Sequence, residues 1–278
     1  MRWRLLWPVV LAVALAVSGA PAAQGDVALE LSTRLRAYVA DYEPLIASVV
    51  AEEEFVQFIR AGSTTRRRRM VSEVGFLRLP GDLDWIGHRS VRTVDGRRVR
   101  VGARPLHEVL SQDGASLRQQ AMAIAAENAQ FNLGFPRTIN LPTLPLDLLH
   151  PRRQQAFSTS YMGRDRIRGR SLEKLRFVEH PPGAIVAASD ATFNRAHVDA
   201  WVEPGTGALI QAHVRLESPG PSRIENQINV VFEPDPELGF LVPTKLTEVF
   251  YFDGYGSGEA VYRRFKRFAT AARIVPQP

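Results

Sequence analysis

Apolar and polar residues alternate along most of the last third of the chain. Apolar and polar residues alternate with a period of two within residues 198–202 and 208–216, and the pattern continues from 224 to 232. A period of two is typical of strands that bury one face and expose the other to water. The pattern therefore predicts that residues 195–268 form consecutive strands of an antiparallel sheet. Residues 261–268 also have a helical spacing, but a closing strand of the sheet is the favoured interpretation.

Strand patterns also occur nearer the N-terminus, at residues 46–60, 66–79, 85–94 and 97–101. The last two flank Asp95-Gly96, which predicts a hairpin. A two-residue loop would place Arg92 opposite Val99 and mix the faces. We expect instead a three-residue loop with Gly96 as its left-handed bulge residue, because it pairs Val91 with Val99 and Arg92 with Arg98.

Two parts of the chain are predicted to be helical. Residues 27–42 carry Leu31, Leu35 and Val39 on one side, and Pro44 is expected to end this helix. Residues 105–110 and 115–131 are also predicted to be helical, and they form an excursion from the sheet.

A proline-rich apolar segment follows, at residues 132–151. Its prolines exclude a regular helix or a central strand. The segment must still bury its side chains, either as a plug or flap inside a curved sheet or as a long connection packed on the core. The apolar residues expected to line a ligand cavity from this flap are Leu133, Phe135, Ile139, Leu141, Leu144 and Leu146.

The N-terminus has the pattern of a signal peptide. Arg2 and Arg4 precede an apolar run at residues 5–17, and small residues follow up to Ala23. We expect residues 1–23 to be removed and residues 24–278 to form a single domain without a transmembrane segment, in the periplasm or secreted. The chain has no cysteine, so thiolate zinc sites, cysteine nucleophiles and disulfides are excluded.

Net charge and composition indicate which classes of partner the protein is expected to bind. The formal net charge of the 278-residue chain is +6, and removal of Arg2 and Arg4 lowers it to +4. Arginines are not interleaved with aromatic residues as in a groove for single-stranded nucleic acid, so no nucleic-acid partner is expected. Three consecutive glutamates at 52–54 would alternate between the two faces of a strand, and we expect a solvated segment.

Candidate chemistry is sparse. The glycines of 254–258 fit neither a phosphate loop nor a nucleophile elbow, and they predict a turn. Matching the faces of the hairpin at Pro204-Gly205-Thr206 would place His197 opposite His213, with Asp199 diagonally near. These three side chains could bind zinc or act as acid and base, but a solvated pair on the polar face is favoured, so no metal or cofactor is expected.

Several motifs resemble known proteins. Residues 127–134, 137–143 and 260–268 resemble an uncharacterised family of secreted bacterial proteins. More remotely, residues 199–207, Val242-Pro243 and the final strand are similar to the outer-membrane lipoprotein-carrier superfamily. This second resemblance implies an open antiparallel half-barrel whose concave apolar face holds acyl chains and is plugged by helices.

These observations together predict an α+β fold. Its curved antiparallel sheet forms an open half-barrel, with an N-terminal helix and a helical, proline-rich insertion that covers or plugs it. The expected function is that of a non-enzymatic binding protein or carrier for a lipid, acyl or other apolar ligand. An envelope module that binds a partner protein is the alternative, and a hydrolase is the second alternative.

Overall fold

The fold is that of a computed structural model, which describes residues 21–78, 85–99, 129–134, 140–181, 186–187, 193–217, 225–252 and 254–267. The predicted signal peptide therefore lies almost wholly outside the described residues. Within the described part, no helix has the length and hydropathy needed to cross a bilayer.

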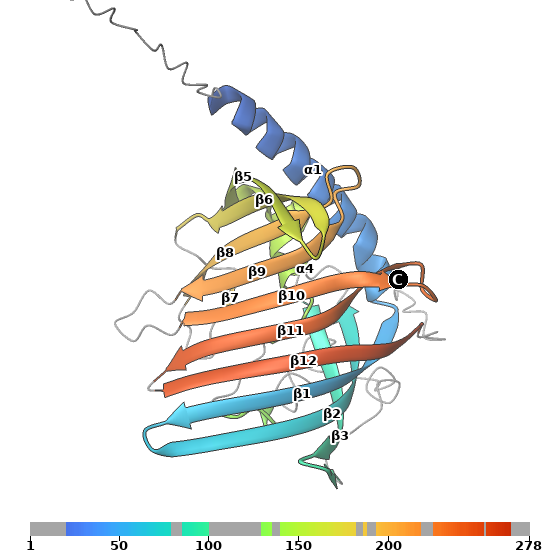
Figure 1. The fold of residues 1–278 in the computed structure, drawn as a ribbon, viewed down its shortest axis with the longest axis vertical. Helices are drawn as coiled ribbons and strands as arrows, with labels where there is room; N and C mark the ends of the chain where they lie inside the picture. Colours follow the sequence, from blue (N-terminus) through green and yellow to red (C-terminus); the bar gives the residue numbers. More distant parts are fainter. Residues whose placement is uncertain are drawn as a thin grey trace, which may run out of the picture.

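One antiparallel sheet dominates the molecule (Figure 1). The helices are α1 (Pro21–Ile46), α4 (Leu144–Leu149) and the 3-10 helix η1 (Pro151–Ala156). The strands are β1 (Val49–Ala61), β2 (Thr64–Arg78), β3 (Trp85–Val94), β4 (Arg97–Arg98), β5 (Phe157–Ile167), β6 (Arg170–Glu179), β7 (Val186–Ala187), β8 (Phe193–Val202), β9 (Leu209–Glu217), β10 (Glu225–Asp235), β11 (Phe240–Phe252) and β12 (Gly254–Arg267).

The strand order is β4-β3-β2-β1-β12-β11-β10-β9-β8-β6-β5, and β7 pairs with β8. All pairs are antiparallel, and the ends do not meet, so the sheet is open. The predicted C-terminal meander is confirmed as β8 to β12, and residues 261–267 are a strand. Figure 1 shows α1 and α4 behind the sheet, on one of its faces. The predicted fold class, an open antiparallel sheet with an N-terminal helix, is confirmed.

Helix α1 buries one stripe against the sheet. Its buried residues recur at helical spacing: Ala28, Leu31, Leu35, Val39, Tyr42 and Ile46. Pro44 lies inside the helix, so the predicted end before Pro44 is wrong. Tyr42 and Ile46 flank the proline and are both fully buried, and we attribute the continued helix to this packing, which outweighs the local preference of proline.

The turn between β8 and β9 fixes the middle of α1. Arg34 donates from Nη1 to the carbonyl oxygen of Pro204 at 2.8 Å. Gly207 has φ of +75°, and a Cβ there would lie 2.6 Å from the carbonyl carbon of Arg34. Only glycine allows both this backbone conformation and this approach.

The β3–β4 loop differs from the expectation. Val94 pairs with Arg97, and Asp95 and Gly96 both have positive φ, so the loop has two residues and not the predicted three. The backbone N–H of Val99 donates to the carbonyl oxygen of Arg92 at 3.0 Å. Arg92 therefore pairs with Val99, in the register that the sequence interpretation rejected.

A bulge inside β3 resolves the conflict of faces that this register creates. Against β2, Thr93 pairs with Val71 but Val91 pairs with Ser72, so Arg92 is the extra residue. Val91 is consequently buried while Arg92 is exposed. The faces are therefore consistent, as predicted, but the bulge that makes them so lies in the strand and not in the loop.

The glycines of 254–258 were predicted to form a turn, and this is wrong because they are part of β12. The Phe250 ring of β11 lies across Gly256, where an added Cβ would fall 2.0 Å from a ring atom. A glycine inside a strand commonly marks such a close approach. The glycines therefore make room for aromatic side chains on the inner face of the sheet.

Only parts of the insertion after β4 are described. The predicted helix 105–110 and most of 115–131 lie outside the described residues. In the proline-rich segment, residues 144–149 form α4, with Pro145 in its first turn, so the prediction that proline excludes a regular helix is wrong for this stretch. A proline in the first turn needs no helical N–H bond. Leu148 and Leu149 are fully buried in the main core.

Candidate ligand cleft and buried polar cluster

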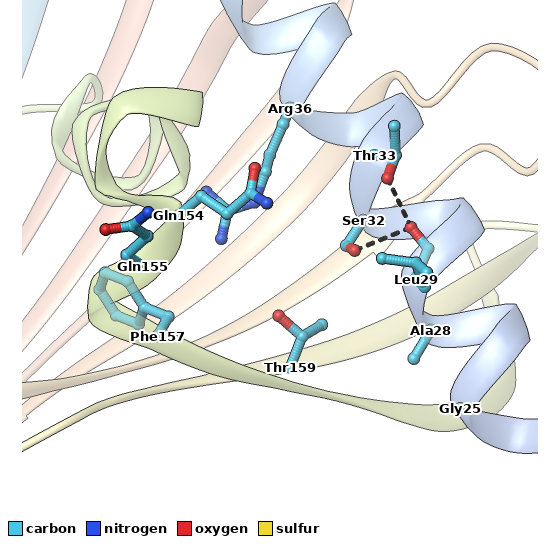
Figure 2. A pocket seen from close by; sticks show the side chains of 10 residues that line it. All are labelled: Gly25, Ala28, Leu29, Ser32, Thr33, Arg36, Gln154, Gln155, Phe157 and Thr159. Carbon is cyan, nitrogen blue, oxygen red and sulfur yellow. Dashed lines mark hydrogen bonds between the residues drawn. The ribbon is translucent and has the colours of Figure 1, made fainter. Parts of the chain in front are cut away.

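A cleft opens where α1 crosses the β5 edge of the sheet. Helix α1, η1 and the start of β5 enclose about 360 Å³. Figure 2 shows the lining side chains, which are Gly25, Ala28, Leu29, Ser32, Thr33, Arg36, Gln154, Gln155, Phe157 and Thr159. This volume lies at the lower end of the range for small-molecule sites, about 300–1,000 Å³.

Arg36 is the charged group of this cleft. It is 4% exposed, and its Nη1 donates to the carbonyl oxygens of Leu149 at 3.2 Å and His150 at 3.1 Å. Its guanidinium also lies 5.3 Å from the ring centre of Phe177. Among the described residues it has no carboxylate partner, and burial lowers its pKa. Figure 2 shows the side chain reaching from α1 towards Gln154.

The remaining lining is divided between polar and apolar groups. The hydroxyls of Ser32 and Thr33 both donate to the carbonyl oxygen of Leu29, so these two groups already have a local partner. Ala28 and Phe157 are buried, and the Leu29 side chain is 66% exposed. The cleft thus combines an apolar wall, an exposed leucine and a buried guanidinium.

A smaller cavity of about 250 Å³ lies near the β5–β6 turn. Apolar side chains of Ile167, Ile210 and Val231 contribute to its lining, and Arg168 and Glu233 form an ion pair beside it. Its charged groups already compensate each other, so it offers less reason for a charged ligand than the α1–β5 cleft.

The predicted flap residues lie elsewhere. Leu146 is in the main core, and Leu133 packs with Ile59 and Phe250 in a separate cluster. The others are Leu141, which is buried, Leu144, which is half-buried, and Phe135 and Ile139, which lie outside the described residues. The described flap residues do not line the α1–β5 cleft. Their predicted contact with a ligand stays a prediction.

The inner face of β1 to β3 holds a buried ion pair. Glu53 is fully buried, so its expected solvation is wrong, although Glu52 and Glu54 do face the other side. Arg89 of β3 donates to Glu53 from Nε at 2.7 Å and from Nη2 at 3.0 Å. Burial lowers the pKa of Arg89, but the Glu53 carboxylate outweighs this and raises it above its usual value.

Polar side chains on the same face of the sheet also bind residues of the insertion after β4. Arg89 donates to Asn140 at both its side-chain oxygen and its carbonyl oxygen, at 3.1 and 2.6 Å. Gln57 accepts from the backbone N–H of Leu133 at 2.8 Å, and Arg68 donates to the carbonyl oxygen of Phe131 at 2.7 Å. The sheet therefore holds Phe131, Leu133 and Asn140 by hydrogen bonds with polar side chains of its inner face, of which Gln57 and Arg89 are buried.

The predicted histidine pair is not formed. His197 pairs with Arg215, and Asp199 pairs with His213, so the register differs by two residues from the prediction. A bulge between Trp201 and Val202 contributes to this shift. Asp199 instead accepts from Arg176 at 2.7 Å and lies 2.9 Å from the Lys174 ammonium. No group of three metal-ligating side chains occurs within the described residues.

The cleft residues were not identified from the sequence. Arg36 is one of many arginines, and only the helical stripe beside it signalled that α1 packs on the sheet. Arg36 directly follows Leu35, which belongs to that stripe. The available signal for the site was therefore a cation adjacent to a buried apolar stripe. The ion pair of Glu53 with Arg89 joins residues 36 positions apart, which no local pattern shows.

Comparisons with known proteins give remote similarity. No protein-family model and no curated protein matches the chain. Among solved structures, the chain is similar to a Vibrio parahaemolyticus domain assigned to outer-membrane lipoprotein sorting, with 9% identity, 90% of this chain and 93% of that chain covered, and a TM-score of 0.41.

Two further structures are similar to the chain. A DUF1329 family protein from Desulfovibrio piger is 11% identical, with 87% and 95% of the two chains covered and a TM-score of 0.36. A LolA superfamily protein from Nitrosomonas europaea is 9% identical, with 90% of this chain and 94% of that chain covered and a TM-score of 0.34. All three similarities are remote in sequence and in structure.

Proposed function

We propose that the protein is a non-enzymatic binding protein or carrier of the cell envelope that holds a lipid or acyl ligand with an anionic head group in the α1–β5 cleft. Arg36 carries this proposal, because a buried guanidinium without a carboxylate partner among the described residues attracts an anion. An anionic head group would form charge-assisted hydrogen bonds with it.

The apolar part of the ligand would contact the wall formed by Ala28, Leu29 and Phe157. A cleft of about 360 Å³ suits a single short chain better than a large lipid. The contact of Leu133, Phe135, Ile139, Leu141, Leu144 and Leu146 with an apolar ligand remains a separate prediction, because the described ones among them do not line this cleft.

The proposed location is the periplasm or the exterior. Arg2, Arg4 and the apolar run at residues 5–17 support export, together with the small residues that follow. Immunoblots of cell fractions should find a protein shortened by about 23 residues outside the cytoplasm. Full-length protein retained in the cytoplasm would contradict this location.

Ligand binding is tested by calorimetric titration with dodecanoate and with dodecanol, which differ in the charge of the head group. Dodecanoate should bind at least about tenfold more tightly, which corresponds to about 1.4 kcal/mol. Arg36→Met should remove this preference, while Arg60→Met, at an exposed arginine of β1, should keep it. Equal affinities for the two compounds, or an unchanged preference in Arg36→Met, would contradict the proposal.

A further inference from the structure

The two edges of the sheet are built differently. Strand β4, at one edge, has only two residues, and both are exposed arginines. Short length and charge are common ways of preventing another strand from pairing with an edge. Strand β5, at the other edge, has 11 residues and no neighbour on its outer side among the described strands.

Only half of β5 is protected in the manner of β4. Its second half contains a bulge, Gly163 with φ of +93°, and the charged residues Arg164, Asp165 and Arg166. Its first half, residues 157–161, has neither charge nor proline nor an irregularity in its pairing with β6. This half is therefore an edge to which a further strand can be added.

The free backbone groups of this half follow from the register. Ala156 accepts from the backbone N–H of His180, so Ser158 and Ser160, at alternate positions, also direct their backbone groups towards β6. The backbone groups of Phe157, Thr159 and Tyr161 then point outwards. The N–H of Phe157 donates to Gln154 of η1, which agrees with this assignment. Thr159 and Tyr161 leave both their N–H and C=O groups for a partner strand.

Positive charge lies at both ends of this edge. Arg152 of η1 and Arg166 of β5 are exposed, and the structure gives neither side chain a carboxylate partner within its described part. Arg164 is 70% exposed, although it contacts Glu173 at 2.8 Å. Two copies of β5 placed side by side would bring arginines together in either direction. An acidic segment would complement them.

We propose that the first half of β5 is the docking edge for an extended acidic segment of a partner protein, which joins the sheet as an additional strand. Its main chain would bond to Thr159 and Tyr161, and its acidic side chains would lie near Arg152 and Arg166. The inner-face side chains of the added strand would point towards the α1–β5 cleft. This interaction goes beyond ligand binding, because it uses backbone groups and exposed arginines that the acyl ligand does not need.

The test uses the purified protein and three blocked ten-residue peptides of alternating threonine and valine, with terminal residue pairs of glutamate, glutamine or lysine. The glutamate peptide should bind, as measured by fluorescence polarisation, at least about tenfold more tightly than the glutamine peptide. Hydrogen exchange should show slower exchange of the amides of Thr159 and Tyr161 when the peptide is bound.

Four variants, one of them a control at a distant strand, examine the two parts of the site. Thr159→Pro removes an outward N–H that the sheet does not use, and it should weaken binding at least about fivefold, whereas Thr159→Val should keep it. Arg152→Glu with Arg166→Glu should reverse the preference towards the lysine peptide. Arg67→Glu, at an exposed arginine of β2 far along the strand order, is the matched control and should change nothing.

Failure of this proposal is distinguishable from failure of ligand binding. Equal binding of the three peptides, no peptide binding, or unchanged amide exchange at Thr159 would overturn the docking edge, even if dodecanoate still bound through Arg36. Binding to phosphatidylglycerol vesicles that depends on Arg152 and Arg166, without peptide binding, would assign these arginines to a membrane surface and would also overturn it.

Discussion

The inner face of the sheet has an apolar half and a polar half. Strands β8 to β10 present fully or nearly fully buried apolar residues to α1 and α4: Ala196, Val198, Ala200, Val202, Ala212, Val214, Leu216, Ile228, Val230 and Phe232. Strands β1 to β3 interrupt such a surface with buried polar residues: Glu53, Gln57, Ser72 and Arg89. One sheet thus binds the segments that cover it by two different physical means.

The two halves of the inner face differ in how precisely they position the segments that they bind. Apolar packing is non-directional and scales with buried area, so it stabilises α1 and α4 without fixing each contact. The bidentate pair of Arg89 and Glu53 has a fixed geometry, and Arg89 also contacts both oxygens of Asn140. Asn140 is therefore held at one position on the sheet. Loss of one partner should cost more in the polar half than loss of an apolar side chain in the other half.

The largest effect is expected from Arg89→Met, which leaves the Glu53 carboxylate buried without its partner. The free energy of unfolding should fall by about 3–5 kcal/mol. The double variant Glu53→Leu, Arg89→Met should recover most of this loss. Urea unfolding followed by circular dichroism measures both values.

Two observations control this result. Arg92→Ala removes an exposed arginine of the same strand, which contacts Glu73, and it should cost less than about 1 kcal/mol. The loss in Arg89→Met should also exceed the loss in the double variant Glu53→Leu, Arg89→Met, because only the single variant keeps a buried carboxylate without its partner. Equal losses in the two variants would show that packing, and not charge, dominates this half.

In the apolar half, Leu148→Ala should lower the free energy of unfolding by about 3 kcal/mol, because a fully buried leucine leaves a cavity. Leu144→Ala, at a half-buried position of the same short helix, should cost less than half as much. Urea unfolding measures both losses. A loss in Leu148→Ala that exceeds the loss in Arg89→Met would contradict the expected order of the two halves.

The boundary between the halves is tested by Gly256→Ala, which adds a methyl group where the Phe250 ring lies. We expect a loss of about 1–3 kcal/mol from overpacking, with partial recovery when Phe250→Leu is added. Gly205→Ala, where an added Cβ has nothing within 4 Å, should have almost no effect. Thermal melts of the three variants would refute the packing account if Phe250→Leu gave no recovery.

The smallest effect is expected on the outer face, at Asp199. Burial would raise the pKa of Asp199, but hydrogen bonds and charges of Arg176 and Lys174 outweigh it and hold the pKa below its usual 3.8. Because the folded pKa is lowered, this stabilisation is present above pH 3.8 and is lost as the pH falls through the folded pKa.

Asp199→Asn should therefore be less stable than the parent protein at neutral pH by about 1 kcal/mol, and the two should converge at acidic pH. Denaturation curves between pH 7 and pH 3 measure this. A constant difference over that range would show that Asp199 acts by its hydrogen bonds and not by its charge.

The sequence predicts much of the sheet, because alternation depends only on which face of a strand is buried. That pattern predicts strands β8 to β12, the common face of Glu52 and Glu54, and the packing stripe of α1. Registers follow less well. The β3–β4 and β8–β9 pairings both differ from the prediction, since bulges at Arg92 and near Trp201 restore the faces at places that no loop motif marks.

The candidate site is harder to predict, because it depends on contacts between distant residues. The burial of Glu53 needs Arg89 from another strand, and the role of Arg36 needs the end of α4. Locally, Glu53 stands in a run of three glutamates, and that run indicates a solvated face. Only the assembled sheet shows that its middle member faces a guanidinium.

The pairing of β1 with β12 has a consequence for how the chain folds. It joins residues as far apart as Val49 and Arg267, and it is the pairing that connects the first strands with the C-terminal meander. Such distant pairing forms slowly, because a long loop must close before any contact is gained. During synthesis, the sheet cannot be completed until its last strand has emerged. The early hairpins must therefore persist with one open side, which a chaperone or an export factor could recognise.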